Sequence, residues 1–310
     1  MPQTVVITGG NGFVGRHLVT ELRAAEPTTR VIVWDRSIDD LLPGTVGVAV
    51  DMMEPASYEE HLREAQPSWV VHLAAVASVA AAKADPALTS RLNVGGTRAL
   101  LSLVQRVSRV TRVLAVSTAD IYGQGSSTPL PELPLAEAWP SNAYAQSKWE
   151  MERVIERDFN DFVIRVRPFP HIGPGQKLGY VTADFASQIA AAEAGQQAPI
   201  IRVGNLEAQR DFTDVRDVVR AYRLLLQFGQ AGDVYHVASG RAVSVQQVLD
   251  RLLALSARTI VVEQDPARMR AADTPILVGD ARKLRQVTAW QPAIALEDSL
   301  ADILTWWRTQ

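Results

Sequence analysis

A glycine-rich turn with Gly9, Gly12 and Gly15, directly after a short β-branched segment, restricts the possible folds of this chain more than any other feature. The segment Thr4–Thr8 leads into GGNGFVG at residues 9–15, and a helical pattern begins at Phe13. Glycines at these positions allow a tight turn, a close approach of a pyrophosphate, and tight packing of the helix on the strand. Because the first N–H groups of a helix and its dipole both favour an anion, the pattern predicts a dinucleotide site. The alternative is a glycine-rich turn with a structural role only.

The rest of the first half alternates between apolar runs and helical stretches. Continuous apolar runs are typical of a parallel sheet covered on both faces, and strand–helix alternation is typical of doubly wound α/β folds. We therefore predict a Rossmann-type parallel sheet with a smaller C-terminal substrate-binding lobe. The predicted strands are residues 4–8, 31–34, 46–50, 69–73, 113–117, 162–167 and 234–237, and the predicted helices are 13–25, 58–65, 86–107, 142–157 and 214–227.

Irregular chain rich in proline and glycine after Pro168 marks the predicted boundary between the two parts. Residues 1–168, with residues 211–240 returning, are expected to form the dinucleotide-binding domain. The substrate-binding lobe is expected to contain residues 169–210 and 241–310. A further segment, residues 123–141, is too long for an ordinary connection, and loops of that length are often functional.

The choice of cofactor depends on Asp35, which follows the second predicted strand and lies 20 residues beyond Gly15. A carboxylate there can hold the hydroxyls of the adenosine ribose and repels the 2′-phosphate of NADP, so it favours NAD(H). Arg36 keeps NADP(H) possible, because its guanidinium could bind that phosphate. Asp51, after the third strand, is either an adenine contact or the cap of its own loop.

The catalytic chemistry is expected from Tyr144 and Lys148, which a helix would place on one face at positions i and i+4. Free tyrosine titrates near 10, and a nearby ammonium, together with an oxidised nicotinamide, would lower that pKa. Thr118 ends the fifth predicted strand, where ligands of open α/β sheets bind. Taken alone, the Tyr–Lys pair is also compatible with an amphipathic surface helix.

Composition excludes several other functions. The chain has no cysteine, so disulfides, thiolate catalysis and cysteine-ligated metals are excluded. Its five histidines show no metal-binding spacing, and we expect no metal site. A net charge of −3 offers no basic field for nucleic acid or an anionic membrane. The N-terminus reads as a first strand rather than a signal peptide, and no apolar run approaches a membrane span, so we expect a cytoplasmic protein.

At this point the chain resembles the extended short-chain dehydrogenase/reductase family over essentially its full length. The matching segments are ITGGNGFVG, VVHLAA, Asn93, STADIYG, YAQSK and RPFPHIGPGQ. The second half is similar to the GDP-4-dehydro-6-deoxy-D-mannose reductase branch, next to the GDP-mannose dehydratases. The segments that carry this narrower resemblance are VGNLEAQRDFTDVRDVVRAY, EQDPARMRAAD and TPILVGDARKLRQVTAWQP.

The resemblance implies roles for particular residues. The implied catalytic set is Thr118, Tyr144 and Lys148, with Asn93 supporting it. The implied cofactor-binding residues are Gly9, Asn11, Gly12, Phe13, Val14, Gly15, Asp35, Arg36, Asp51, Met52, Leu73, Ala74, Ala75, Asn93, Tyr144 and Lys148. The implied substrate-binding residues are Thr118, Asp120, His171, Arg210, Arg270 and Asp273; guanidinium groups suit the diphosphate of a sugar nucleotide.

The resemblance also implies a reaction: reduction of the C4 keto group of a GDP-4-keto-6-deoxyhexose, giving GDP-D-rhamnose or GDP-6-deoxy-D-talose. Three positions depart from the family pattern: Pro170 replaces an asparagine that helps seat the diphosphate, Ala271 replaces a common proline, and Ala119 lacks the polar group of the dehydratases. The alternatives are a nucleotide-sugar 4-epimerase and a non-catalytic dinucleotide sensor. By analogy with the family, helices 86–107 and 142–157 are expected to pair across a homodimer.

Overall fold

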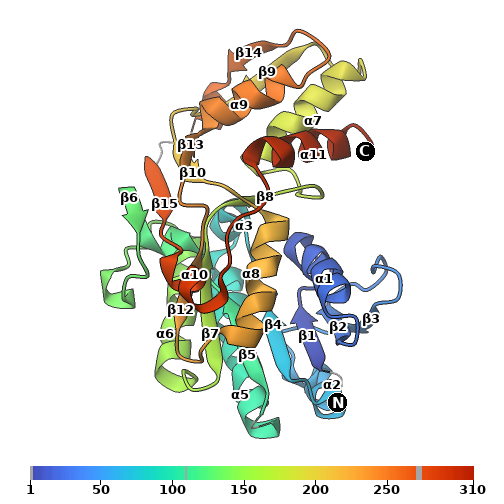
Figure 1. Cartoon of the computed structure of the whole chain (residues 1–310), viewed down its shortest axis with the longest axis vertical. Helices are drawn as coiled ribbons and strands as arrows, with labels where there is room; N and C mark the ends of the chain where they lie inside the picture. The colour runs from blue at the N-terminus through green and yellow to red at the C-terminus, as the bar shows by residue number, and fades with distance from the viewer. Residues whose placement is uncertain (1–2, 109, 270–273) are drawn as a thin grey trace.

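A seven-stranded parallel sheet forms the centre of the larger lobe in this computed structural model, which describes residues 3–108, 110–269 and 274–310 (Figure 1). Its strand order is β12-β7-β5-β4-β1-β2-β3, and the predicted Rossmann-type sheet is confirmed. The central strands are buried on both faces, which explains their unbroken apolar sequences. The bounds are β1 Thr4–Thr8, β2 Arg30–Asp35, β3 Val46–Ala49, β4 Trp69–His72, β5 Arg112–Val116, β7 Val163–Pro168 and β12 Val234–Val237.

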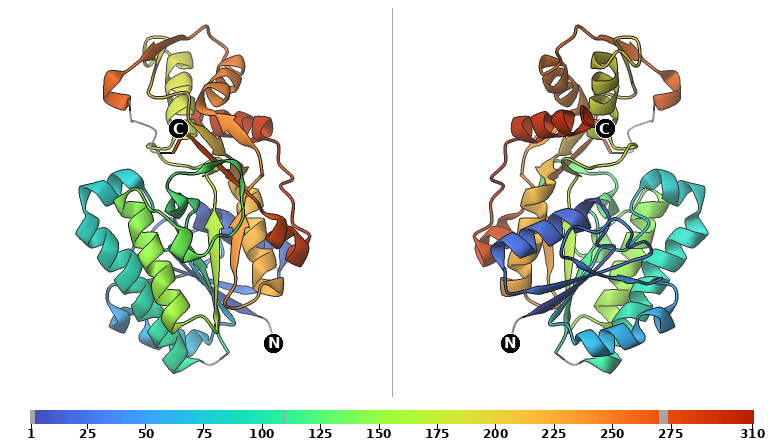
Figure 2. Two further views of the ribbon diagram at one scale, coloured as in Figure 1. Left: turned by 90° about the vertical axis from the view of Figure 1, so that its left-hand side faces the viewer. Right: turned by 90° about the vertical axis from the view of Figure 1, so that its right-hand side faces the viewer.

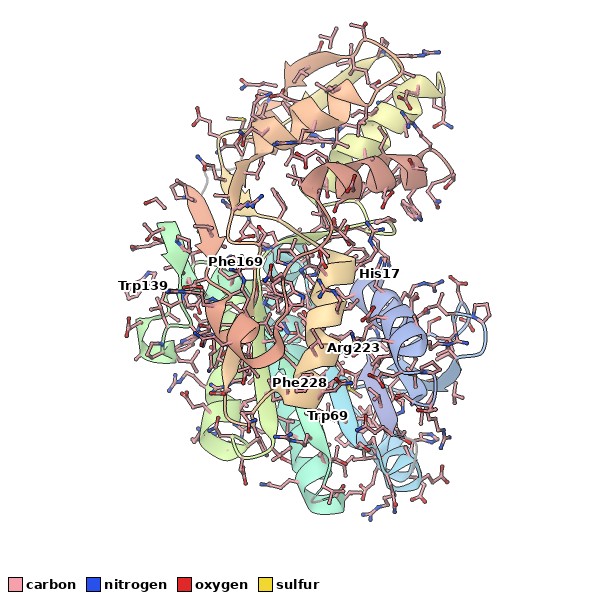
Figure 3. The ribbon with its side chains drawn as sticks, in the orientation of Figure 1. His17, Trp69, Trp139, Phe169, Arg223 and Phe228 are labelled. Carbon is pink, nitrogen blue, oxygen red and sulfur yellow. The ribbon has the colours of Figure 1, made fainter. Side chains whose placement is uncertain are left out.

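Helices cover both faces of this sheet as two separate layers (Figure 2). One layer packs on the core that contains Ile7 and Leu114, and the other packs on the core that contains Val6 and Val113. The first layer consists of α1 Phe13–Ala25, α8 Val215–Phe228 and α10 Arg282–Thr288; the second of α2 Glu59–Ala65, α5 Thr97–Val107 and α6 Ala143–Asp158. Arg223 of α8 also donates to Glu21 of α1 at 2.8 Å, which ties the two helices together (Figure 3).

The second lobe has its own apolar core, in the upper part of Figure 1. Phe185, Ile189, Val248 and Leu300 are among its buried side chains. The lobe consists of α7 Val181–Glu193, α9 Val245–Ala254, α11 Leu296–Trp307 and the paired strands β9 Ile200–Val203 and β14 Val261–Gln264. Helices α7, α9 and α11 pack on one another, and the lobe lies over the carboxyl ends of the large sheet.

A four-stranded sheet joins the two lobes, and one of its strands comes from residues 123–141, which the sequence predicts to be a loop. Its order is β13-β10-β15-β6, with β13 Ala242–Ser244, β10 Gln209–Asp211, β15 Ile276–Gly279 and β6 Ser126–Leu130. The segment that sequence treats as a loop therefore contains a strand, which pairs in parallel with β15. Such a long-range partner leaves no local signal in the sequence.

The expected division at residue 241 also differs from the packing in one place. Helix α10 contacts α8 and β12, and Leu284 and Trp290 lie in the core of the larger lobe. Part of segment 241–310 therefore returns to the dinucleotide-binding domain because its apolar side chains complete that core. Within the described part of the chain, no helix is long and apolar enough to cross a membrane.

The helix expected over residues 86–107 forms as three consecutive segments. Helix α4 covers Pro86–Ser90, a π-helical segment covers Arg91–Gly96, and α5 continues from Thr97. Asp85 caps α4 by accepting the backbone N–H of Leu88 at 2.8 Å. Wide turns of this kind are frequent at functional sites, and Asn93 lies inside this one.

Candidate active site

The turn between β1 and α1 has the geometry of a phosphate cradle. Gly9 has a φ of 68°, and a Cβ there would lie 2.8 Å from the backbone nitrogen of Ala74. A Cβ on Gly15 would lie 2.5 Å from the Cα of Gly10, so the helix packs directly on the turn. Helix α1 begins after Gly12 without any side-chain cap, which leaves its first N–H groups available to an anion. These donors fit the pyrophosphate of a dinucleotide.

Asp35 lies beside this turn at the end of β2. Its carboxylate accepts the backbone N–H of Asn11 at 3.0 Å and that of Arg36 at 2.8 Å. Arg16 in turn donates to the side chain of Asn11 at 2.9 Å. The Arg36 side chain is exposed and forms no ion pair within the described ranges. The two residues relevant to the choice of cofactor are therefore both present. The Asp35 carboxylate is held by backbone N–H groups, whereas the Arg36 side chain is exposed.

The end of β4 is held by a buried chain of hydrogen bonds. Thr8 Oγ1 lies 2.8 Å from Nδ1 of His72, and Nε2 of the same ring lies 2.9 Å from Oγ1 of Thr97. Burial lowers the pKa of His72 to about 3, with the Lys148 ammonium acting in the same direction. The imidazole is therefore neutral. Thr8 also accepts the N–H of Leu73 with its carbonyl at 3.1 Å and the N–H of Ala74 with its hydroxyl at 3.2 Å, and Ala75 follows directly.

Asp51 and Met52 follow β3 at the same edge. The carboxylate of Asp51 accepts the N–H of Met53 at 2.9 Å, as expected for the cap of its own loop. Met52 is buried, and its backbone oxygen lies 3.3 Å from the position of a Cβ on Gly96. The adenine contact predicted for these residues stays a prediction.

Tyr144 and Lys148 lie one turn apart on α6, which Asn142 caps by accepting the N–H of Ala145 at 2.9 Å. The Lys148 ammonium donates to the carbonyl oxygen of Val116 at 2.7 Å, at the end of β5. Thr118 follows two residues later, and its hydroxyl accepts the N–H of Asp120. The structure thus brings the three predicted catalytic residues to the carboxyl ends of the central strands.

The ionisation of these groups differs from the sequence-based expectation. Burial raises the pKa of Tyr144 above its usual value, and the Asp120 carboxylate adds to this, whereas the Thr118 hydroxyl opposes it. Burial lowers the pKa of Lys148 to about 8, against the opposing effect of Glu152. In this structure the Lys148 ammonium donates to the Val116 carbonyl, and burial is the largest influence on the pKa of the phenol. The tyrosine is therefore protonated at neutral pH, which is the state needed to donate a proton.

Asn93 ties the catalytic helix to the loop after β4. Its side-chain oxygen accepts the N–H of Val76 at 2.8 Å, and its Nδ2 donates to the Val76 carbonyl at 3.0 Å and to Ser147 Oγ at 2.9 Å. Ser147 lies between the two catalytic residues of α6 and donates to the carbonyl of Tyr144. Asn93 therefore positions Tyr144 relative to the loop that covers the strand ends.

Asp120 and Arg210 form the polar wall of the site opposite α6. Burial raises the pKa of Asp120 while Arg210 opposes that rise, and burial lowers the pKa of Arg210 while Asp120 opposes it. Arg210 comes from β10 in the joining sheet, so a residue of the second half reaches the Rossmann strand ends. Its guanidinium also donates to the backbone carbonyl of Gln209 at 2.8 Å.

His171 lies next to the phosphate-binding turn. It belongs to the short strand β8 His171–Ile172, and its ring stacks on Phe13 with centroids 6.3 Å apart and planes 4° from parallel. The predicted contact of His171 with the substrate stays a prediction. The neighbouring Pro170 accepts the N–H of Thr213 through its carbonyl at 3.0 Å, so the backbone is fixed there without an asparagine side chain. Arg270 and Asp273, the other two predicted substrate residues, lie outside the described residues, as does Ala271.

Two residues near the site were not anticipated from the sequence. Tyr180, at the start of α7, donates to the carbonyl of Ala77 at 3.4 Å and so connects the second lobe with the loop after β4. Glu152 continues the row of Tyr144 and Lys148 by one more turn of α6 and forms a buried ion pair with Arg167 at 2.8 Å. The spacing of residues 144, 148 and 152 was a usable signal for Glu152, whereas no local pattern identifies Tyr180.

The fold and the site together define a class. A glycine turn leads into α1, a fixed carboxylate follows β2, and a threonine, a tyrosine and a lysine meet where β4 and β5 end. This combination on a seven-stranded sheet with a C-terminal lobe is that of the extended short-chain dehydrogenases/reductases, which are dinucleotide-dependent enzymes.

The chain belongs to the GDP-mannose 4,6-dehydratase family, whose model matches residues 6–303. It is 37% identical to the GDP-6-deoxy-D-mannose reductase of Pseudomonas aeruginosa, covering 100% of this chain and 99% of that protein. It is 29% identical to the GDP-6-deoxy-D-talose 4-dehydrogenase of Aggregatibacter actinomycetemcomitans, covering 91% and 90%. Among solved structures, RMD from Pseudomonas aeruginosa complexed with NADPH superposes with a TM-score of 0.86 at 35% identity, covering 99% of each chain.

Proposed function

We propose that this protein is a nucleotide-sugar oxidoreductase that reduces the C4 keto group of a GDP-4-keto-6-deoxyhexose. The observation that carries the proposal is the meeting of Tyr144, Lys148 and Thr118 at the strand ends, next to a turn suited to a dinucleotide pyrophosphate. The likeness to a GDP-6-deoxy-D-mannose reductase over the full chain supports the choice of substrate class. A second relative acts on GDP-6-deoxy-D-talose, so the product is GDP-D-rhamnose or its C4 epimer.

The turn of residues 9–15 and the uncapped start of α1 would hold the pyrophosphate of a reduced dinucleotide, which would supply the hydride for C4. The substrate's ketone oxygen then takes a proton from the Tyr144 phenol, so that one hydride and one proton convert the carbonyl into an alcohol. Thr118 is placed to donate a hydrogen bond to that oxygen as negative charge develops on it. Lys148, held at Val116, stabilises the phenolate that remains. Arg210 offers a guanidinium to the diphosphate, and Asp120 opposes the lowering of its pKa by burial.

The cofactor is NAD(H) or NADP(H), since solved structures of similar chains hold NADPH or NAD. Asp35 beside the ribose position favours NAD(H), as the sequence predicts. The free Arg36 and the NADPH held by the 35% identical structure favour NADP(H). Measuring kcat/KM with both cofactors decides between them. Arg36→Ala should lower kcat/KM for NADPH and leave that for NADH unchanged if Arg36 binds the 2′-phosphate.

The main test is a coupled reaction. The protein is incubated with GDP-mannose, a 4,6-dehydratase and each reduced cofactor, and the sugar is identified by NMR. Consumption of the cofactor in step with formation of a GDP-6-deoxyhexose is expected. Absence of any 6-deoxyhexose with both cofactors would reject the reductase.

Interconversion of sugars with retained NAD and no consumption of cofactor would instead identify a 4-epimerase, an activity named for a 26% identical relative. Binding of the dinucleotide without any turnover would identify a sensor.

A homodimer and a cytoplasmic location remain predictions. Helices α5 and α6 lie side by side on the second face of the sheet, and they carry the exposed pair Arg98–Asp158. We propose that this face pairs across a two-fold axis. A sizing column with light scattering at micromolar concentration should give twice the mass of the chain, and a clean monomer would reject the proposal.

A further inference from the structure

A groove of about 900 Å³ lies between the two lobes, on the side of the joining sheet away from the catalytic residues. We call it the rear groove; its walls include the loop of residues 239–241, α10 and the start of α11. The alternation of side chains along β10 shows why the rear groove is separate from the candidate active site. Arg210 faces Asp120, whereas the next residue, Asp211, accepts the backbone N–H groups of the groove residues Ser239 and Gly240.

Four arginines line the rear groove, and two of them have no carboxylate partner. Arg251 pairs with Glu297 at 2.9 Å and Arg282 pairs with Asp280 at 2.6 Å. These two carboxylates are the acidic side chains of the lining, so the groove carries two net positive charges. This local excess contrasts with the net charge of −3 for the chain. An anion is therefore attracted to this surface rather than to the molecule as a whole.

Arg241 and Arg285 are the two arginines without a partner. Among residues 3–108, 110–269 and 274–310, neither guanidinium forms an ion pair or a side-chain hydrogen bond. Nε of Arg285 is buried and lacks any acceptor, which is unfavourable for a group that carries charge. A Cβ on Gly240 would lie 3.7 Å from the terminal nitrogen of Arg285, so this guanidinium lies against the loop that carries Arg241. Both guanidinium groups line the same groove, and planar guanidinium groups suit the oxygens of a multiply charged anion.

The rest of the lining suits a ligand of nucleotide size. Helix α11 begins in the groove at Ala295, which provides no side-chain cap, so the positive end of its dipole adds to the arginines. Phe212, Val243 and Ile294 provide an apolar wall. Ligand sites typically combine several hundred Å³ and an apolar lining with a few fixed polar groups.

We propose that the rear groove is a second binding site, specific for a polyphosphate of the chemical class of pyrophosphate and nucleoside triphosphates, with Arg241 and Arg285 as its principal ligands. The site is distinct from the cleft that holds the cofactor and the sugar nucleotide. It does not depend on the reaction proposed above.

Calorimetric titration with inorganic pyrophosphate at low ionic strength tests the proposal. The full chain is first saturated with NADPH and GDP, so that phosphate sites in the cleft are filled. Wild type should bind pyrophosphate saturably at about one equivalent. Arg241→Gln/Arg285→Gln should weaken that binding by about tenfold or more, the loss expected when charge-assisted hydrogen bonds to phosphate are removed.

Arg258→Gln is the matched control, because Arg258 is exposed and is not part of the groove lining, and it removes the same charge. It should bind as wild type does. Arg241→Gln alone keeps the half-buried Arg285 intact, and it must still weaken binding if the double variant proves misfolded by circular dichroism. No saturable binding, or equal affinity in wild type and the Arg241 variant, would overturn the proposal. Because the readout is binding, the result stands whether or not the protein reduces a GDP-sugar.

Discussion

Protonation of Tyr144 is the property on which the proposed reduction depends at the scale of single residues. Burial and the nearby Asp120 both raise the pKa of the phenol, so the acid form dominates at neutral pH. Lys148 is held at the Val116 carbonyl, and burial lowers its pKa to about 8. The pair therefore offers one proton to the substrate and one charge that stabilises the phenolate once that proton has left.

Tyr144→Phe should reduce kcat by about 100-fold or more, the usual contribution of a general acid, while the affinity for the cofactor stays within about twofold. The physical reason is that the ring remains but the proton is lost. Turnover and cofactor binding measured by fluorescence titration check both parts. Tyr58→Phe is the control, since its hydroxyl is buried without a hydrogen-bond partner in the described structure and its loss should leave turnover unchanged. Near-normal activity of Tyr144→Phe would remove this residue from the mechanism.

The positions of single site residues could be predicted where local sequence determines them, and their cofactor and catalytic roles stay predictions. The glycine turn, Asp35 and the Tyr144–Lys148 pair all lie within or next to elements with strong periodicity, and the structure places them at one sheet edge. Arg210 was found by resemblance only, because its position depends on β10 joining strands from distant parts of the chain. Tyr180 was missed for the same reason, as it reaches Ala77 across 103 positions of sequence.

At the scale of one element, the 3.6-residue period of helix α6 places three functional side chains on one face. Tyr144, Lys148 and Glu152 follow one another at four-residue intervals, so they lie in one row. Glu152 is fully buried and forms an ion pair with the equally buried Arg167, which also donates to the Tyr122 hydroxyl at 2.7 Å. The negative end of this row opposes the effect of burial on Lys148 and helps to keep the ammonium charged.

Glu152→Gln should therefore lower the pKa of Lys148 further below about 8, because burial would act without the opposing carboxylate. The alkaline limb of the kcat/KM profile should move to lower pH, while the KM for the cofactor changes little. Glu152→Asp keeps the charge and should restore the wild-type profile. Glu156→Gln, one turn further and half exposed, is the control and should leave the profile unchanged. An unmoved alkaline limb in folded Glu152→Gln would exclude this role.

Element bounds were predicted closely where strand and helix are joined by short turns. Strand β1 and helix α1 begin and end where the sequence indicates, at Thr4–Thr8 and Phe13–Ala25. The π-helical segment Arg91–Gly96 was not anticipated, because its apolar pattern is that of a helix and only the tertiary hydrogen bonds of Asn93 distinguish it. Strand β6 was missed because a strand at Ser126–Leu130 needs β15 as its partner.

The whole molecule should lose stability as the pH falls, because two buried histidines are neutral in the folded state. The pKa values of His72 and His236 are each lowered to about 3, mainly by burial, from an ordinary value of about 6.5. Between these pH values the unfolded chain takes up protons that the folded chain does not. The stability associated with the neutral rings is therefore complete above pH 6.5 and is lost progressively toward pH 3.

His72→Asn should flatten the dependence of the free energy of unfolding on pH by up to about 1.4 kcal/mol per pH unit in this window, since each histidine contributes one proton. Urea unfolding at several pH values between 4 and about 7 provides the measurement. His61→Asn, at an exposed position of α2, should leave the slope unchanged. Equal slopes for wild type and His72→Asn would show that this ring does not carry the effect.

The four-stranded joining sheet interleaves one strand from the first half of the chain, β6, with three from the second half. A cut at the apparent border after Pro168 would therefore leave β6 in one fragment and its partner β15 in the other. The cofactor half would lose α8, α10 and β12 from its own layers as well. Exchange of the C-terminal half at this border would therefore separate paired strands of one sheet and open the core of the larger lobe.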